Sequence, residues 1–127
     1  MKKLFVSVPM KNRNQWDIQA SMTKMKKIAE AFAGEEFELI NSYIDDIPPE
    51  NHNSAIWYLG KALEKLSAAD VFIGLSDTQG WNGCRIENNV AHMYGLKCYA
   101  VETSLILAEH EKAAMPLAKS AVYDFNV

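Results

Sequence analysis

The sequence predicts an α/β protein in which helices cover both faces of a mostly parallel β-sheet. Short apolar runs rich in β-formers alternate along the chain with longer segments whose apolar residues recur every three or four positions. This alternation of period is typical of strand–helix–strand units with right-handed crossovers. No repeat, low-complexity tract or linker divides the 127 residues. We therefore expect one domain over residues 1–127.

The first half of the chain predicts two strands and two helices. The first strand stops at Pro9, and Gly34 is a C-cap candidate for the first helix. In both helices the apolar residues fall on one face, as in a helix that packs against a core. The expected elements are a strand over residues 4–8, a helix over 14–32, a strand over 37–40, and a helix marked by Ile56, Leu59, Leu63 and Leu66.

In the second half of the chain the alternation of strand and helix patterns continues, and it becomes weaker toward the last residues. A polar, glycine-bearing stretch separates the third strand from a third helix, which Gly95 ends. We expect this helix to carry its apolar residues on one face and its functional residues on another. The expected elements are a strand over residues 71–75, a helix marked by Ile86, Val90 and Met93, a strand over 98–101, a helix over 105–114 and an edge strand over 122–125.

The composition of the chain indicates which classes of binding partner and which cellular location to expect. With 13 Lys+Arg against 16 Asp+Glu, the net charge of −3 lacks the basic balance of a protein that binds long nucleic acid. Neither Cys84 nor Cys98 belongs to a zinc-ligand spacing or a disulfide framework, and the three histidines lie on separate elements, so no metal is expected. No run approaches the roughly 20 apolar residues that cross a bilayer. These features favour a soluble, cytoplasmic protein.

Candidate ligand-binding residues cluster in two loops that follow strands, since ligands of open parallel sheets lie beyond the carboxyl ends of the strands. The first loop offers Ser7, Pro9, Met10, Lys11 and Arg13. It opens a helix whose free N–H groups attract anions such as phosphate or carboxylate, although its two cations are equally typical of a solvated loop. Neither GxxxxGK[ST] nor GxGxxG follows the strand, so no motif supports ATP or NAD and no cofactor is expected.

The second loop leads into the third helix and contains Glu87. If Asn82 or Gly83 is the N-cap, Glu87 lies beyond the position at which a glutamate completes a capping box. Helical spacing places it with Cys84, Asn88 and Ala91 on a face distinct from the apolar one, and this favours a carboxylate directed into the cleft. The alternative is a glutamate that only benefits from the helix dipole.

Other side chains around this loop have two interpretations each. Trp81 suits stacking on a nucleobase, or it packs on its own helix. Asn82 and Asn88 suit ribose hydroxyls, although Asn82 is as readily a cap. On the second helix, the adjacent Trp57 and Tyr58 cannot both lie on the apolar stripe, and an outward aromatic side chain favours a subunit interface.

Four sequence blocks resemble the nucleoside 2-deoxyribosyltransferase-like superfamily, in particular its small bacterial and phage-borne members. They read SVPM at residues 7–10, ADVFIGL at 69–75, GWNGCRIE at 80–87 and YGLK at 94–97. The resemblance covers about residues 3–102 and implies a doubly wound, five-stranded sheet of flavodoxin-like or Rossmann-like type. It also implies cleavage of the N-glycosidic bond of a nucleoside or nucleotide, with transfer of the sugar to a base or to water. The family nucleophile, which forms a covalent glycosyl-enzyme, matches Glu87, and family members are homo-oligomers.

Two acidic residues that the family often carries are absent here. Their positions are occupied by Ala62 on the second helix and by Trp81 in the second loop. Asp77, in the same loop, is the remaining candidate to protonate the leaving base. The departures leave open a second interpretation, in which the chain is a non-catalytic nucleotide-binding or sensing module on the same fold.

Overall fold

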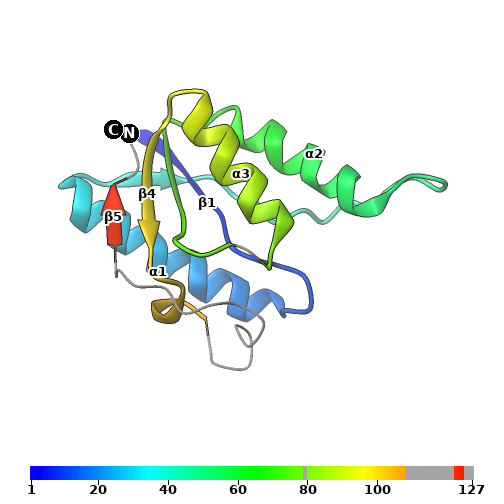
Figure 1. The fold of residues 1–127 in the computed structure, drawn as a ribbon, viewed down its shortest axis with the longest axis horizontal. Helices are drawn as coiled ribbons and strands as arrows, with labels where there is room; N and C mark the ends of the chain where they lie inside the picture. Colours follow the sequence, from blue (N-terminus) through cyan, green and yellow to red (C-terminus); the bar gives the residue numbers. More distant parts are fainter. Residues whose placement is uncertain (79, 108–121, 125–127) are drawn as a thin grey trace.

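Four parallel strands and three helices form an α/β, Rossmann-like fold (Figure 1). The computed structural model describes residues 1–78, 80–107 and 122–124. The elements are β1 (Lys2–Val6), α1 (Gln15–Ala33), β2 (Phe37–Leu39), α2 (Ser54–Leu66), β3 (Val71–Leu75), α3 (Asn82–Met93), β4 (Lys97–Val101), the 3-10 helix η1 (Thr103–Leu105) and β5 (Val122–Asp124). Among the described helices none has the length and apolar character needed to cross a membrane.

The strand order is β2-β1-β3-β4-β5, and only β5 runs antiparallel to its neighbour. From β1 the chain passes to β2 on one side and then returns to β3 on the other, so the winding reverses between β1 and β3. In open α/β sheets this reversal is the place where ligands bind. The edge strand expected over residues 122–125 corresponds to β5, with Phe125 outside the described residues. Of the helix expected over residues 105–114, Leu105 instead ends the 3-10 helix η1, residues 106–107 are not helical, and residues 108–114 lie outside the described part of the chain.

α1 covers one face of the sheet, as its sequence pattern predicts. Asn14 caps its start by accepting a hydrogen bond from the Asp17 N–H, and Gly34 ends it with a left-handed φ of 73°. The buried stripe of α1 packs on β1 and β3 to form the larger apolar cluster. Its central members are Leu4, Val6, Ile18, Met22, Met25, Ala29, Val71 and Ile73.

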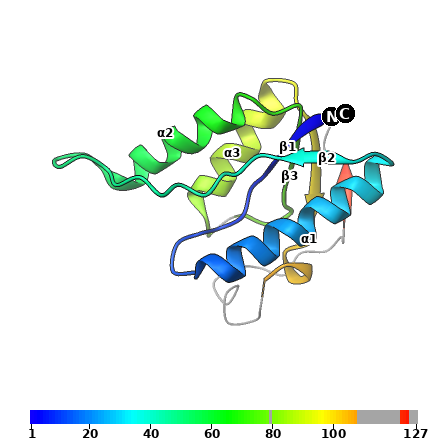
Figure 2. The same cartoon turned by 180° about the vertical axis from the view of Figure 1, so that it is seen from behind.

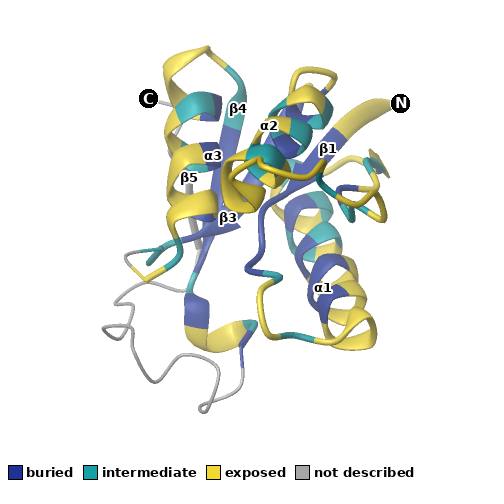
Figure 3. Cartoon of the chain, turned by 90° about the vertical axis from the view of Figure 1, so that its right-hand side faces the viewer, coloured by how far each residue is buried: buried dark blue, intermediate teal, exposed yellow. Residues whose placement is uncertain are grey.

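α2 and α3 cover the opposite face (Figures 2 and 3). The predicted stripe of α2 packs there through Leu63 and Leu66, although Ile56 is exposed. The predicted stripe of α3 proves wrong apart from Val90. Ile86 and Met93 are 38% and 75% exposed, and α3 instead buries Cys84, Glu87 and Ala91. The physical reason lies in the sheet, because the stacked rings of Phe5 and Phe72 fill the space above β1 and β3. A helix can approach these rings closely only with small side chains.

The end of β1 and the start of α3 also differ from expectation. β1 ends at Val6 and not at residue 8, because beyond the Ser7 N–H, which bonds to the Ile73 carbonyl, Pro9 has no N–H to extend the ladder. The N-cap of α3 is Trp81, not Asn82 or Gly83. The Trp81 carbonyl accepts the first helical hydrogen bond, from the Arg85 N–H at 3.0 Å, and no side chain caps the helix.

Candidate functional site

The candidate site lies between the carboxyl ends of β1 and β3, where the winding reverses. Ser7 follows β1 and is buried, and its Oγ donates a 2.6 Å hydrogen bond to Oε1 of Glu87 on α3. Glu87 is only 9% exposed, and within the described part of the chain it forms no ion pair. A single hydroxyl group therefore holds the carboxyl group of Glu87 through one of its two oxygens. The carboxyl group lies where open α/β sheets commonly bind ligands, at the reversal of the winding.

Burial dominates the electrostatics of Glu87. It raises the pKa of this carboxyl from 4.5 to about 7, although the Ser7 hydrogen bond acts in the opposite direction. Near neutral pH both protonation states are therefore accessible, as in carboxyl groups that act in catalysis. Burial, followed by the charge of Glu87, also raises the pKa of Cys84 to about 12, so this residue contributes a thiol and not a nucleophilic thiolate.

Ser7→Ala is expected to raise the pKa of Glu87 above its native value. The substitution removes the donor that favours the ionised form and leaves the desolvation unchanged. Titration of the glutamate side-chain carboxyl carbons by NMR would measure the shift, with the exposed Ser104 changed to Ala as the control. An unchanged or lowered pKa in the Ser7 variant would show that the hydroxyl does not hold the carboxylate.

Two buried polar atoms, one on α3 and one just beyond β3, have no hydrogen-bond partner among the described residues. These are Oδ1 of Asn88 and Oγ of Ser76, and both are buried. Asn88 lies over Gly74 of β3, since a Cβ built on that glycine would stand 3.7 Å from Asn88 Oδ1. The same Cβ would come within 2.9 Å of a Phe72 ring carbon, so glycine at this position keeps the space below α3 open.

The first loop is fastened to α1, and several of its candidate residues lie away from Glu87. Pro9 is buried and Met10 is half-buried against the larger apolar cluster. The Arg13 guanidinium donates to the Pro9 carbonyl at 3.0 Å and to Ser21 Oγ at 2.8 Å, so it fastens the loop to the helix. Lys11 is exposed. Asn14 already caps the amino end of α1, and Asp17 adds an acidic side chain to the first turn.

The candidate residues of the second loop also differ in their burial. Trp81 is half-buried and packs against the larger apolar cluster, whereas Asn82 and Gly83 are exposed in the first turn of α3. Asp77 is half-buried, and its carbonyl accepts a 3.2 Å hydrogen bond from Thr103 Oγ1. The structure thus brings together Ser7, Glu87 and Asn88. Sequence reasoning does not single out Ser76, although a hydroxyl directly after a strand end was an available signal.

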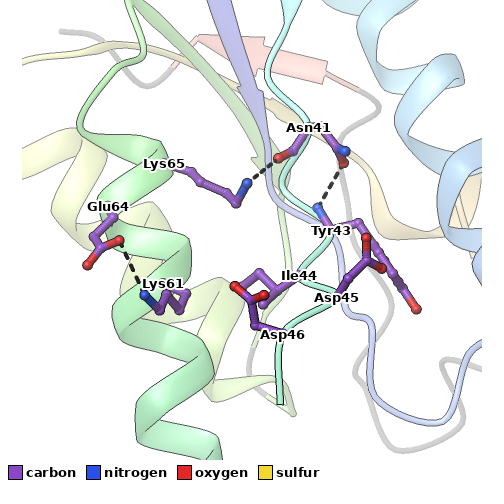
Figure 4. Close-up of a pocket in the computed structure, with 8 residues that line it drawn as sticks. All are labelled: Asn41, Tyr43, Ile44, Asp45, Asp46, Lys61, Glu64 and Lys65. Carbon is purple, nitrogen blue, oxygen red and sulfur yellow. Dashed lines mark hydrogen bonds and ion pairs between the residues drawn. The ribbon is translucent and has the colours of Figure 1, made fainter. Parts of the chain in front are cut away.

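Two hollows in the described structure lie away from Glu87. One of about 460 Å³ opens between α2 and the loop after β2, where Lys65 donates to the Asn41 carbonyl at 2.9 Å (Figure 4). The other, of about 310 Å³, lies at the amino end of the sheet and is lined by Lys2, Asp70 and Lys97. The candidate site is therefore defined by its side chains and its place in the topology. No group of three or more His, Cys, Asp or Glu residues in the described ranges is arranged to hold a metal ion.

Comparison with known proteins supports the fold. No protein-family model and no curated protein matches the chain. A solved structure, described as a conserved protein from Enterococcus faecalis V583, superposes with a TM-score of 0.52 at 20% sequence identity. The match covers 90% of this chain and 73% of that one. At this identity the likeness shows a shared α/β architecture and carries no information on activity.

Proposed function

We propose that the chain cleaves the N-glycosidic bond of a small nucleoside or nucleotide, with Glu87 as the nucleophile. The observation that carries the proposal is the buried carboxyl group of Glu87, held by Ser7 at the reversal point of the sheet. Glu87 matches the nucleophile of the deoxyribosyltransferase-like family that the sequence blocks resemble, and a buried carboxyl group beyond the carboxyl ends of the strands suits such chemistry. The proposal includes the doubly wound, five-stranded sheet that the resemblance implies, with β5 at its edge.

The reaction has two displacements at C1′ of the sugar. In the first, ionised Glu87 forms an ester bond from Oε2 to C1′ while the bond from C1′ to the base nitrogen breaks, and its electron pair leaves with the base. The departing base takes a proton from a general acid, for which Asp77 is the candidate. In the second, water or an acceptor base attacks C1′ and loses a proton, the ester breaks, and the Glu87 carboxylate is regenerated.

The hydrogen bond from Ser7 gives the two carboxylate oxygens different roles. Oε1 is engaged by the hydroxyl at 2.6 Å, which leaves Oε2 as the oxygen for attack. The same donor stabilises the carboxylate when the ester breaks in the second displacement. Around this centre we assign the sugar or its 5′ substituent to the loop that carries Ser7, Pro9, Met10, Lys11 and Arg13, and the base to the side of Trp81, Asn82 and Gly83.

A non-catalytic nucleotide-binding module is the second candidate. A specific observation favours it, because the two positions at which the family often has acids contribute to packing here. Ala62 is a buried residue of α2, and Trp81 packs against the larger apolar cluster. In this alternative Glu87 binds a ligand without forming a bond to it.

Chromatography of reactions with nucleosides and nucleoside 5′-monophosphates, in ribose and 2′-deoxyribose forms, tests the proposal. Free base released by the native chain, with and without an acceptor base, supports cleavage and separates hydrolysis from transfer. Binding of a nucleotide by calorimetry without any base release supports the second candidate. Absence of both binding and release contradicts both.

We also propose that the chain forms homo-oligomers. The first half of α2 has no buried residue, and it exposes Ile56 at 66% and Tyr58 at 38% beside Trp57. An apolar helical surface of this kind is typical of an interface between subunits. Light scattering is expected to give a mass of at least twice 14.3 kDa, and a 14.3 kDa particle at micromolar concentration would contradict it.

A further inference from the structure

Glu87 and Asn88 lie over neighbouring positions of two strands. The register pairs Val6 with Ile73, and the Ser7 N–H bonds to the Ile73 carbonyl, so Ser7 is next to Gly74 in the sheet. Glu87 receives the Ser7 hydroxyl, and Oδ1 of Asn88 lies over Gly74. Two consecutive side chains of α3 therefore place their oxygens side by side, one over β1 and one over β3.

Ser76 belongs to the same group of side chains. Its N–H bonds to the Val101 carbonyl at 2.8 Å, so the chain is still paired with β4 two residues beyond Gly74. In a strand, residues two apart point to the same face, which places Ser76 on the α3 side with Gly74. Ser76 Oγ and Asn88 Oδ1 are both buried and have no hydrogen-bond partner among the described residues.

Unpaired buried polar atoms of this kind are uncommon in native proteins and cost stability. Asn88 Oδ1 can only accept a hydrogen bond, whereas a serine hydroxyl can donate and accept. A hydroxyl group that donated to Asn88 and accepted from Ser76 would satisfy both atoms. A sugar hydroxyl beside the nucleophile has this chemistry.

The stereochemistry of the proposed reaction identifies which hydroxyl this is. In a β-nucleoside the base leaves C1′ from one face of the sugar, so the Glu87 carboxylate attacks from the opposite face. The 2′-hydroxyl of ribose projects from that opposite face, on the carbon next to C1′. A 2′-deoxyribose has no group there to donate to an acceptor adjacent to the nucleophile.

We infer that Asn88 and Ser76 recognise the 2′-hydroxyl of a ribose, so that the chain acts on ribonucleosides or ribonucleotides in preference to their 2′-deoxy counterparts. The inference rests on the proposed function, and it names the sugar that the same site takes. A site built to pair a substrate hydroxyl discriminates against the analogue that lacks it, because its polar atoms then remain buried and unpaired.

The test compares kcat/KM for adenosine, guanosine, cytidine, uridine and their 5′-monophosphates with the values for the matching 2′-deoxy compounds. The native chain is expected to favour the ribose form by about tenfold or more. Asn88→Ala and, separately, Ser76→Ala should each remove most of this preference by slowing the ribose substrates alone. Asn89→Ala, at the exposed neighbouring position of α3, should leave the preference unchanged. Circular dichroism would establish that each variant folds.

Preference of the native chain for 2′-deoxy substrates, or an equal loss on both sugars in both variants, would overturn the inference while leaving the proposed reaction intact. If no substrate releases base, calorimetry on Glu87→Gln still decides the sugar. Tighter binding of a ribonucleotide than of its 2′-deoxy form, reduced by Asn88→Ala, would retain the recognition without the reaction. Equal binding of the two forms, or binding of neither, would contradict recognition of the 2′-hydroxyl.

Discussion

Glu87→Gln is expected to lose base release by at least about a thousandfold on any nucleoside that the native chain cleaves. The amide oxygen can still accept the Ser7 hydrogen bond, so the geometry at Oε1 is preserved. The amide cannot form the glycosyl ester, because it lacks the ionised oxygen that attacks C1′. Timed chromatography of free base at saturating substrate, at pH 8, measures the loss.

Glu38→Gln is the matched control for this substitution. Glu38 is an exposed glutamate on β2, so its neutralisation should leave the rate within about twofold of native. A Glu87 variant that retained a tenth or more of native activity would show that another group attacks the sugar. Loss of activity in both variants would point to an effect of net charge and not to the nucleophile.

The same Glu87→Gln substitution is expected to stabilise the folded chain at pH 8 by up to about 3 kcal/mol, and to have little effect at pH 4. The difference comes from the raised pKa of about 7 against 4.5 for the ordinary group. Below pH 4.5 the carboxyl is protonated in both folded and unfolded chains. Between pH 4.5 and about 7 only the folded chain keeps the proton, so native stability falls as the pH rises, and above about 7 the full cost of the buried charge is present.

Urea unfolding of the native chain and of Glu87→Gln, at several pH values between 4 and 8, measures this difference. The gap between the two free energies of unfolding should grow with pH, whereas the Glu38→Gln variant should follow the native curve. A constant gap, or a Glu87→Gln variant less stable than native at pH 8, would mean that burial does not raise the pKa of Glu87 in the folded chain. Functional sites commonly lower the stability of the folded chain, and a buried ionised carboxylate has this effect.

The sequence pattern predicts those elements of the fold in which local signals and tertiary packing agree. α1 is the clearest case, since its buried stripe and the Gly34 C-cap match the structure. The third strand was predicted with its observed bounds, because five consecutive apolar residues between polar segments suit a strand buried on both faces. In both cases the residues of the element itself decide the outcome.

The pattern fails at α3, where the neighbours of the helix decide which face is buried. Periodicity favours the face that carries Ile86 and Met93, but Phe5 and Phe72 already occupy the space above the sheet, and α3 packs through Cys84 and Ala91. The prediction that Glu87 lies on a separate face from the apolar residues is consistent with this packing. That its face is the buried one follows only from the three-dimensional arrangement.

The role of Arg13 shows the same limit within the candidate site. A cation after the first strand suits an anionic ligand in sequence terms, yet its guanidinium binds the Pro9 carbonyl and Ser21 Oγ. Ser21 lies eight residues further along, and its buried position on α1 cannot be anticipated from loop composition. Ser76 is the converse case, because its place after a strand end is visible in the sequence whereas the burial of its unpaired hydroxyl is not.

Mass spectrometry of the chain after incubation at pH 8 with 2′-deoxy-2′-fluoro nucleosides tests the central claim most directly. Fluorine beside C1′ disfavours the cationic transition state, so the glycosyl ester should accumulate. The expected result is an added mass equal to one fluorinated sugar, located by tryptic digestion and fragmentation on Glu87 within residues 86–97 and absent from Glu87→Gln. An adduct on another residue, or one that forms equally on Glu87→Gln, would contradict the assignment of Glu87 as the nucleophile.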